Sequence, residues 1–258
     1  FLHDSYTSFT DNFLSHYLSA FRKTYSSNHV LMKLIETWKK QLDDKNIVGA
    51  VLIDLSKAFD CIPHDLLIAK MYEYGFSIDT LTFFFSYLKR RNQHVKINNV
   101  TSKQQILKTG VPQGSILGPT LFNIFLNDFF LFVSLTEVAN FADDNTLYTT
   151  NKDRGDLVNS LELGCEQANS WFHSNQMFAN PEKFQVLVVG DKDEEMPLTL
   201  NINGIEIKPS ASVALLGIEI DNKLNFEKHV LTICNKASNQ LNALSRIQPF
   251  MGSKEKKS

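Results

Sequence analysis

The sequence has few cysteines and no excess of positive charge, and each shortage argues against a class of protein. Its three cysteines, Cys61, Cys165 and Cys234, are widely separated and form no CxxC pair. This pattern argues against a disulfide framework and a zinc site. It predicts reduced thiols in the nucleus or cytoplasm rather than secretion. The formal net charge of −2 argues against a basic surface over the whole protein, so any contact with nucleic acid must come from local patches.

The chain also lacks a visible signal peptide and a hydrophobic run long enough to cross a membrane. Its most apolar segment, LFNIFLNDFFLFVSL at residues 121–135, is too short to span a bilayer and contains Asn123, Asn127 and Asp128. We interpret it as a buried amphipathic helix and expect no membrane partner. The chain begins with Phe1 and ends in SKEKKS without a structural signal, so we interpret it as part of a longer protein.

Phenylalanine is abundant, with 20 among 258 residues, so much of the core should be aromatic. Periodicity predicts helices from Ser27 onward, at 64–75, 77–91, from about 117, 153–175 and 226–247. It predicts strands at 46–55, 184–189 and 213–220, and hairpins at Asn98-Asn99, Asn203-Gly204 and Asp143-Asp144. The cations at residues 89–91 should end the helix at 77–91 and suit its dipole. This order predicts an α+β fold, an antiparallel sheet with helices on one face.

Two acidic positions stand where apolar strands end. Asp54 directly follows the apolar run AVLI, where a charge costs several kcal/mol if it is buried without a partner. Asp143 and Asp144 lie in VANFADDNTLY, at the predicted hairpin tip. If the two strands are neighbours in one antiparallel sheet, the carboxylates emerge at the same sheet end. From spacing alone, a turn cap at the strand end explains Asp54 as well as a metal site does, and turn chemistry is the better interpretation of the Asp143-Asp144 pair taken by itself.

Oxygen ligands of this kind suit Mg²⁺, and two such ions catalyse nucleotidyl transfer. Neighbouring strand residues point to opposite faces, so we expect Asp143 to be the bridging ligand and Asp144 to give weaker support. The loop TGVPQGSILGPTLFN at 109–123 can bring backbone close to a ligand before a helix, although such loops are also common as plain turns.

The motifs AVLIDLSKAFDCIPH, GVPQGSILGPTLFN and FADDN, in this order and spacing, closely resemble the palm motifs of non-LTR (LINE-type) retrotransposon reverse transcriptases. LSAFRKTYSSNHVLMKLI resembles the fingers motif of that family, and WFHSNQMFANPEKFQVLVVG its fourth palm motif. VALLGIEIDNKLNFEKHV resembles its primer grip leading into the thumb. The resemblance covers essentially residues 15–250, and the ordered set is very specific.

The resemblance implies a right-hand polymerase fold and a role for each matching residue. Asp54, Asp143 and Asp144 would be catalytic and would hold two Mg²⁺ ions, with Mn²⁺ possible. Lys183 would protonate the leaving pyrophosphate. Substrate-binding residues would be Arg22 at the triphosphate, Phe59 as a gate against ribose 2′-OH groups, and Gln113 and Gly114 in the nucleotide and template pocket.

Nucleic acid would be contacted by Arg90, Arg91 and Lys96, next to Lys89, which as readily suits a solvated helix end. The implied partners are an RNA template, a DNA primer and a dNTP. The implied domains are partial fingers at 1–46, a palm at 47–222 with a fingers insertion at about 64–110, and the start of a truncated thumb at 223–258.

The function implied is RNA-directed DNA synthesis, in which a primer 3′-OH attacks the α-phosphate of a dNTP. The alternative is a non-catalytic remnant of a retrotransposon polymerase that keeps the fold or only binds RNA. A metal-dependent nuclease is disfavoured, because the Gln113 loop and the Phe59 gate would then have no role.

Overall fold

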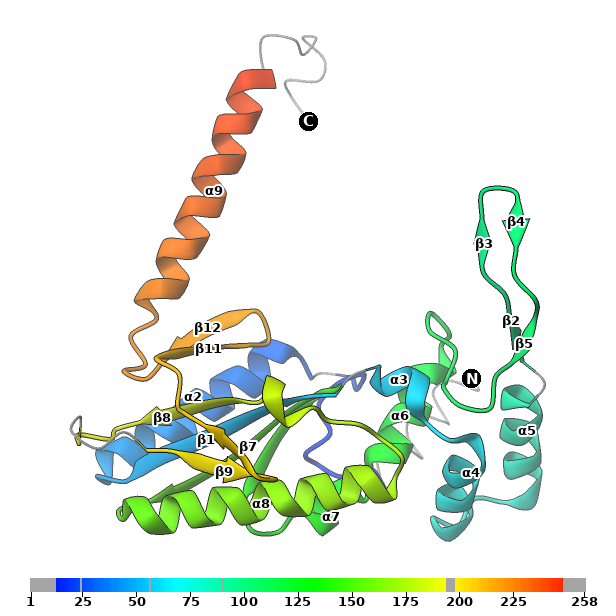
Figure 1. The fold of residues 1–258 in the computed structure, drawn as a ribbon, viewed down its shortest axis with the longest axis horizontal. Coiled ribbons are helices and arrows are strands. Elements are labelled where there is room, and N and C mark those ends of the chain that lie inside the picture. The colour runs from blue at the N-terminus through cyan, green and yellow to red at the C-terminus, as the bar shows by residue number, and fades with distance from the viewer. Residues whose placement is uncertain (1–12, 24, 56, 90, 194–197, 248–258) are drawn as a thin grey trace.

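The structure, a computed structural model, describes residues 13–23, 25–55, 57–89, 91–193 and 198–247 of the chain. At its centre lies a four-stranded sheet in the order β6-β7-β1-β8, in which every neighbouring pair is antiparallel (Figure 1). Its strands are β1 (Ile47–Asp54), β6 (Glu137–Phe141), β7 (Asp144–Asn151) and β8 (Gln185–Val189). The predicted α+β fold with an antiparallel sheet is confirmed.

The other elements are helices and short two-stranded hairpins. The helices are α2 (Ser27–Asp43), α3 (Ala58–Cys61), α4 (His64–Glu73), α5 (Ile78–Leu88), α6 (Leu117–Leu126), α7 (Phe129–Phe132), α8 (Arg154–Ser174), the 3₁₀ turn η1 (Pro181–Lys183) and α9 (Glu227–Ile247). The hairpin strands are β2 (Asn92–Gln93), β3 (Lys96–Ile97), β4 (Val100–Thr101), β5 (Gln105–Ile106), β9 (Leu200–Ile202), β10 (Ile205–Ile207), β11 (Ser212–Leu215) and β12 (Ile218–Asp221).

Strand β1 is buried along its whole length except at Asp54, as its apolar sequence predicted. Gly49 faces α8, and an added Cβ there would come within 2.6 Å of Leu161 Cδ1. Since successive strand residues alternate between faces, Ala50 lies on the other face, where it packs in a second core with Trp38 of α2. The β11–β12 hairpin also belongs to this second core. Elements therefore cover both faces of the sheet, where the sequence predicted helices on one.

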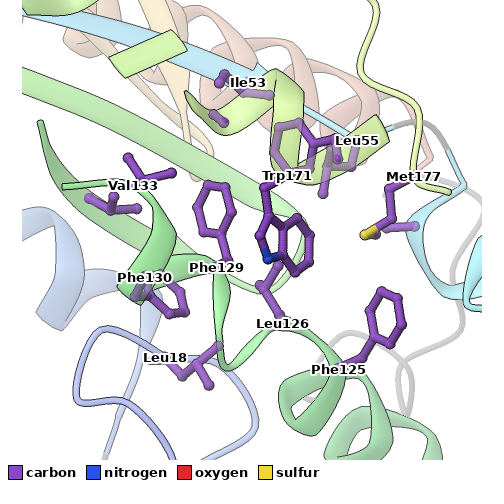
Figure 2. Packing of buried hydrophobic residues seen from close by; sticks show 14 of the residues in the cluster. Leu18, Ile53, Leu55, Phe125, Leu126, Phe129, Phe130, Val133, Trp171 and Met177 are labelled. Atoms are coloured by element: carbon purple, nitrogen blue, oxygen red, sulfur yellow. The ribbon is translucent and has the colours of Figure 1, made fainter. Parts of the chain in front are cut away.

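The core on the α8 side contains a cluster of aromatic rings, although most of its buried side chains are aliphatic, so the aromatic share is smaller than the phenylalanine content predicted. Figure 2 shows Phe129 and Trp171 side by side among the buried side chains of α6, α7 and α8. The ring of Phe129 stacks on Phe172 at 5.2 Å and 15°, and meets Trp171 edge-on at 5.2 Å. Offset-stacked and edge-to-face pairs of this kind add to the stabilisation that burial provides.

Polar residues set the helix ends where the sequence predicted them. The side chain of Ser26 accepts a hydrogen bond from the His29 backbone N–H at the start of α2. Asp153 accepts one in the same way from Asp156 at the start of α8. Such caps satisfy N–H groups that have no partner within the helix. Helix α5, however, ends at Leu88, so the predicted extension through the cations is wrong, and Lys89 is already extended.

Two predicted elements are divided in the structure. The strand expected at 213–220 is the β11–β12 hairpin, because Leu216 and Gly217 adopt positive φ and turn the chain. The single helix expected at 121–135 is split into α6 and α7. At this break Asn127 uses its side-chain oxygen to accept a hydrogen bond from the Ser15 N–H at 2.6 Å.

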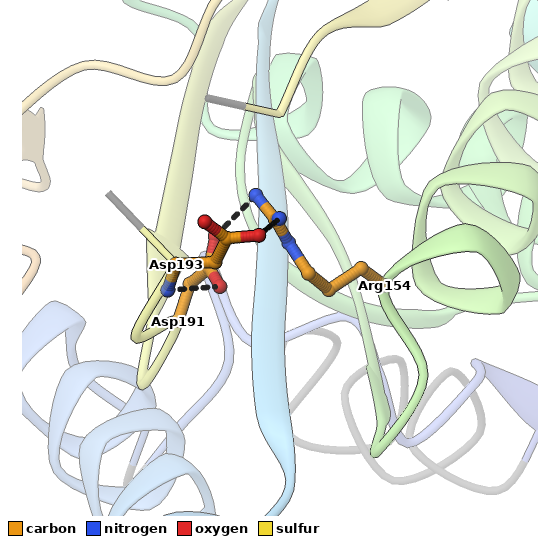
Figure 3. Close-up of polar contacts among 3 residues, drawn as sticks. All are labelled: Arg154, Asp191 and Asp193. Atoms are coloured by element: carbon orange, nitrogen blue, oxygen red, sulfur yellow. Dashed lines mark hydrogen bonds and ion pairs between the residues drawn. The ribbon is translucent and has the colours of Figure 1, made fainter. Parts of the chain in front are cut away.

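At the end of the sheet where β1 begins, one cation joins two acids. Arg154, at the start of α8, pairs with Asp191 at 3.0 Å and also with Asp193, both in the loop after β8 (Figure 3). Its side chain is 24% exposed and that of Asp191 18%, so this cluster is partly shielded from solvent. It fixes the start of α8 against the end of β8.

Two elements extend away from this packed body. The hairpin that contains β2 to β5 projects from the end of α5, and α9 projects from the β11–β12 hairpin (Figure 1). The predicted Asn98-Asn99 turn is confirmed, since β3 and β4 pair on either side of it. None of the described helices is both long enough and apolar enough to cross a membrane.

Candidate active site

The register between β1 and β7 places two carboxylates face to face. Asp54 is the last residue of β1, Asp144 is the first residue of β7, and the two are direct partners across the antiparallel pair. Directly opposite residues in such a pair project from the same face of the sheet. The sequence predicted that Asp54 and the Asp143-Asp144 pair would emerge at the same sheet end if their strands were antiparallel neighbours. Strands β1 and β7 are such neighbours.

The structure differs from the sequence prediction in which acid faces Asp54. The turn between β6 and β7 consists of Ala142 and Asp143, so Asp144 stands in the strand and Asp143 at the tip. Only Asp144 is therefore aligned with Asp54. The expected division of labour, with Asp143 as the bridging ligand, stays a prediction.

This turn is held by two buried asparagines. Ala142 adopts a φ of +57°, a left-handed conformation that costs an alanine about 1–2 kcal/mol. Asn140 donates through Nδ2 to the Ala142 carbonyl at 2.8 Å and to Asn145 Oδ1 at 3.0 Å. Asn145 in turn donates to the Asp143 carbonyl at 3.1 Å. The network fixes both acids at the tip although one backbone conformation is unfavourable.

A third strand brings Lys183 to the same place. Gln185 of β8 is the partner of Leu52 in β1, and the two strands run in opposite directions. Residue 183 consequently comes level with residue 54. Lys183, Asp54 and Asp144 line one small cavity of about 50 Å³, together with Ala214 and Leu215 of β11. It has room for a few water-sized groups and is smaller than typical ligand pockets.

The carboxylates of this cluster repel one another. Partial burial raises the pKa of Asp144, and the charges of Asp143 and Asp54 raise it further. Within the described part of the chain, none of these three acids forms an ion pair. An added cation would relieve this repulsion.

Oxygen donors of this type are those that Mg²⁺ prefers. The chemistry of the donor set therefore fits a divalent cation. Among the described residues, however, no three acidic, histidine or cysteine side chains are gathered closely enough to form a complete metal site. The protein side of the site thus consists of two facing carboxylates with a third close by.

Phe59, five residues after Asp54 in the chain, and the loop that contains Gln113 lie against each other. Phe59 is half-buried, and its ring stacks on Phe122 of α6 at 4.4 Å and 16°. The Phe59 carbonyl accepts a hydrogen bond from the Val111 N–H at 2.8 Å, and Gln113 donates to Asp60 at 3.0 Å. Gly114 has a φ of +77°, which glycine adopts without strain.

Gly110 allows the loop to approach α3 this closely. Its φ is +88°, and an added Cβ would lie only 2.9 Å from the Asp60 carbonyl oxygen. His64 holds the same point, because its Nε2 lies 2.8 Å from the Gly110 carbonyl. This contact gives His64 a structural role, in which it holds the loop at Gly110 in place.

Arg22 is not a lining residue of the cavity with Asp54. Its guanidinium donates to the carbonyls of Ser15 and Leu18 and lies 5.1 Å above the Tyr25 ring. Its neighbour Phe21 nevertheless meets Phe59 edge-on at 6.0 Å, so this segment borders the same region. The role of Arg22 at the triphosphate stays a prediction.

Two of the predicted nucleic-acid residues, Arg91 and Lys96, lie on the projecting hairpin. Arg91 and Lys96 are both exposed, and Lys96 begins β3. Arg90 lies outside the described residues. The two described cations are therefore accessible to nucleic acid, as their predicted contacts require.

Sequence reasoning missed three residues of the site. Asp60 holds Gln113, Phe21 flanks Phe59, and Leu215 closes the cavity over the acids. Asp60 could have been found, because it directly follows Phe59 within the recognised motif. Leu215 could not, because the turn that folds β11 over the sheet was predicted as continuous strand.

Most of the chain matches a known protein family. The family described as "Reverse transcriptase (RNA-dependent DNA polymerase)" matches residues 4–220. The chain belongs to this family.

Among its sequence relatives are polymerases of non-LTR retrotransposons. The RNA-directed DNA polymerase from mobile element jockey of Drosophila melanogaster is 26% identical over 220 residues, which cover 83% of this chain and 24% of that protein. The Pol polyprotein from type-1 retrotransposable element R2 of Popillia japonica is 28% identical, covering 64% of this chain and 29% of that protein. This reverse transcriptase chain thus spans about a quarter of the length of the curated relatives it matches.

A solved structure with the same fold is the apo telomerase of Candida tropicalis truncated from its C-terminal domain. The TM-score is 0.57 at 16% identity, with 87% of this chain and 44% of that chain covered. At this identity the likeness concerns the fold alone, and it agrees with the antiparallel sheet described above.

Proposed function

We propose that this reverse transcriptase domain extends a DNA primer with dNTPs on an RNA template, in the nucleus or cytoplasm. The observation that carries the proposal is the pairing of Asp54 with Asp144 on the same small cavity as Lys183. Facing carboxylates without a cation partner in the described residues suit a divalent ion. A lysine on the same cavity suits proton donation to a leaving phosphate.

The domain assignments follow the same proposal. Residues 1–46 would be part of the fingers, 47–222 the palm with a fingers insertion at about 64–110, and 223–258 the start of the thumb. The central sheet with its acidic end lies within the proposed palm.

In the proposed mechanism, Asp54, Asp143 and Asp144 would hold two divalent cations, Mg²⁺ or Mn²⁺. When bound, these ions would activate the attacking hydroxyl and stabilise charge on the leaving phosphate. The residues of the chain do the remaining work. Lys183 donates a proton to the leaving pyrophosphate, and Arg22 orients the triphosphate.

Phe59, Gln113 and Gly114 would form the nucleotide pocket. The stack of Phe59 on Phe122 gives its ring a fixed position, as a steric gate requires. Gln113 is oriented by its hydrogen bond to Asp60, and the glycine after it leaves space for a base pair. Arg91 and Lys96, with Arg90, would contact the phosphates of template and primer.

The test is primer extension on an RNA template with dNTPs and Mg²⁺. We expect Asp54→Asn to reduce extension at least about 10³-fold, since it removes one of the two facing carboxylates. Asp44→Asn, which removes an exposed carboxylate at the end of α2, is the matched control and should extend normally. Retained extension by Asp54→Asn would contradict the site. No extension by folded wild-type chain would favour an RNA-binding remnant.

A second prediction concerns sugar selection. Phe59→Val shortens the side chain at the proposed gate, so we expect ribonucleotides to be incorporated at least about tenfold more efficiently relative to dNTPs. The measurement is the ratio of kcat/KM for a dNTP and its matching rNTP. An unchanged ratio would show that Phe59 serves only to pack on Phe122.

A further inference from the structure

The segment around the projecting hairpin has an unusual charge. Residues 80–127 contain no aspartate or glutamate and six cations, so this span carries +6. The whole chain totals −2, which leaves −8 for all its other residues. The near-neutral total therefore conceals one strongly basic region in an otherwise acidic protein. A concentration of cations in one element is the usual electrostatic mark of a phosphate-binding surface.

The cations of this segment are available to a partner. We call residues 91–108 the arm; its cations are Arg91, Lys96, Lys103 and Lys108, and all four are exposed. None of the four forms an ion pair with any residue that the structure describes. Arg91 and Lys96 are part of the proposed template contact above, whereas Lys103 and Lys108 extend it along the returning strands.

The arm is also apolar, although nothing in the described part of the chain buries it. Val95, Ile97, Val100 and Ile106 are 55%, 68%, 74% and 69% exposed. Its four short strands pair only with one another. Figure 1 shows the arm standing clear of the body beyond α5. An exposed surface that is both cationic and apolar suits a ligand with phosphates and uncovered bases.

Aromatic rings continue this surface from the arm onto α5. The guanidinium of Arg91 lies 5.8 Å from the Tyr87 ring centre, and the Tyr87 ring is nearly parallel to Phe83 at 6.5 Å and 13°. Phe83 is 54% exposed. Tyr87 is half-buried against the core, so Phe83 offers the exposed ring on which an unpaired base can stack, because every base has a π-face.

At its other end the arm leads directly into the proposed nucleotide pocket. Strand β5 ends at Ile106, and Thr109 forms a bridge with Pro63 just before the Gln113 loop. A strand of nucleic acid that follows the arm would therefore arrive at this loop.

We propose that the arm and the exposed ring of Phe83 on α5 bind single-stranded RNA before it enters the polymerase site. The proposal rests on the proposed function only in identifying that RNA as the template. A single strand fits better than a duplex, since the bases of a duplex are stacked on one another and leave the apolar and aromatic side chains without contacts. The binding would not depend on base sequence.

The test is the salt dependence of binding to a labelled, unstructured oligouridylate. The variant replaces Arg91, Lys96, Lys103 and Lys108 with Gln. Each phosphate contact with a single strand contributes about −0.7 to the slope of log K against log salt, so we expect the slope to flatten by about 2–3 units. Affinity at 0.1 M salt should fall at least about tenfold.

The matched control replaces Lys39, Lys40, Lys152 and Lys192 with Gln. These four lysines are exposed and lie outside the arm, so the change in net charge is the same. We expect the control to keep most of the wild-type slope. Equal losses in the two variants would overturn the proposal, because they would reflect total charge alone.

A second variant separates stacking from charge. Phe83→Ala should weaken binding of the oligouridylate at least about fivefold and leave the salt slope unchanged. Binding of a double-stranded RNA of equal length should be unaffected by this variant. Equal weakening on duplex would overturn the assignment to a single strand. Self-association of wild type that the arm variant abolishes would overturn it in favour of a protein partner.

Extension assays distinguish failure of this proposal from failure of the proposed function. The arm variant should need at least about tenfold more template for half-maximal extension, with an unchanged maximal rate. Asp54→Asn should lose extension and keep wild-type affinity for oligouridylate. An inactive wild-type chain would count against the polymerase only, since the binding experiment needs no catalysis.

Discussion

Acidic side chains gather at both ends of the central sheet, but they form ion pairs with a cation at only one of them among the described residues. Where β1 begins, the two acids Asp191 and Asp193 share the guanidinium of Arg154. Where β1 ends, Asp54 and Asp144 face each other with Asp143 nearby, and no ion pair within the described residues neutralises them. At the first end, the acids already have a cation from the chain itself as their partner. At the second end, acids outnumber the one lysine, Lys183, that lines the same cavity, which is the arrangement expected of a site that binds a cation.

The largest effect on stability should come from removing the cation at the end of the sheet where β1 begins. Arg154→Met would leave Asp191 and Asp193 repelling each other. We expect the free energy of unfolding to fall by about 1–2 kcal/mol, because the pair is only partly shielded. Chemical denaturation at low and high salt measures this, and the loss should be smaller at high salt. No change at low salt would show that the cluster in Figure 3 contributes nothing to stability.

Removing an acid at the other end of the sheet should instead stabilise the fold, and by a smaller amount. The folded chain raises the pKa of Asp144, so its ionisation opposes folding as pH rises through that value. Without divalent cations, Asp144→Asn should therefore raise Tm slightly at pH 7–8. The gain should vanish below about pH 3, where aspartate is protonated in both the folded and the unfolded state.

The control for this prediction is Asp44→Asn, whose carboxylate is exposed at the end of α2. Added Mg²⁺ should narrow the gap between wild type and Asp144→Asn, because a cation would compensate the cluster. A lower Tm for Asp144→Asn at pH 8 without metal would contradict the electrostatic account.

The sequence predicted the elements of this sheet well and its register poorly. The apolar run before Asp54 and the helical periodicity from Ser27 and from about 153 are local signals, and they predicted β1, α2 and α8. The partner of Asp54 depends on where the turn closes. That turn places Ala142 in a left-handed conformation, which asparagine side chains stabilise and which alanine alone does not predict.

The candidate site was predicted chiefly through its motifs, and the surrounding packing was not. Lys183 was identified, but its place beside Asp54 follows from the register of β8, which no local pattern reveals. The cover over the cavity was missed because Leu216 and Gly217 turn a continuous apolar run into a hairpin. The cations at residues 89–91 were expected to end a helix, whereas α5 stops at Leu88 and Arg91 begins the projecting arm.

The most direct test of the central claim is whether the facing carboxylates bind a divalent cation. Electron paramagnetic resonance of Mn²⁺ titrated into the chain counts bound ions without requiring catalysis. We predict that wild type binds Mn²⁺, that Asp54→Asn and Asp144→Asn each weaken this binding at least about tenfold, and that Asp191→Asn does not. Equal Mn²⁺ binding by wild type, Asp54→Asn and Asp144→Asn would contradict the account.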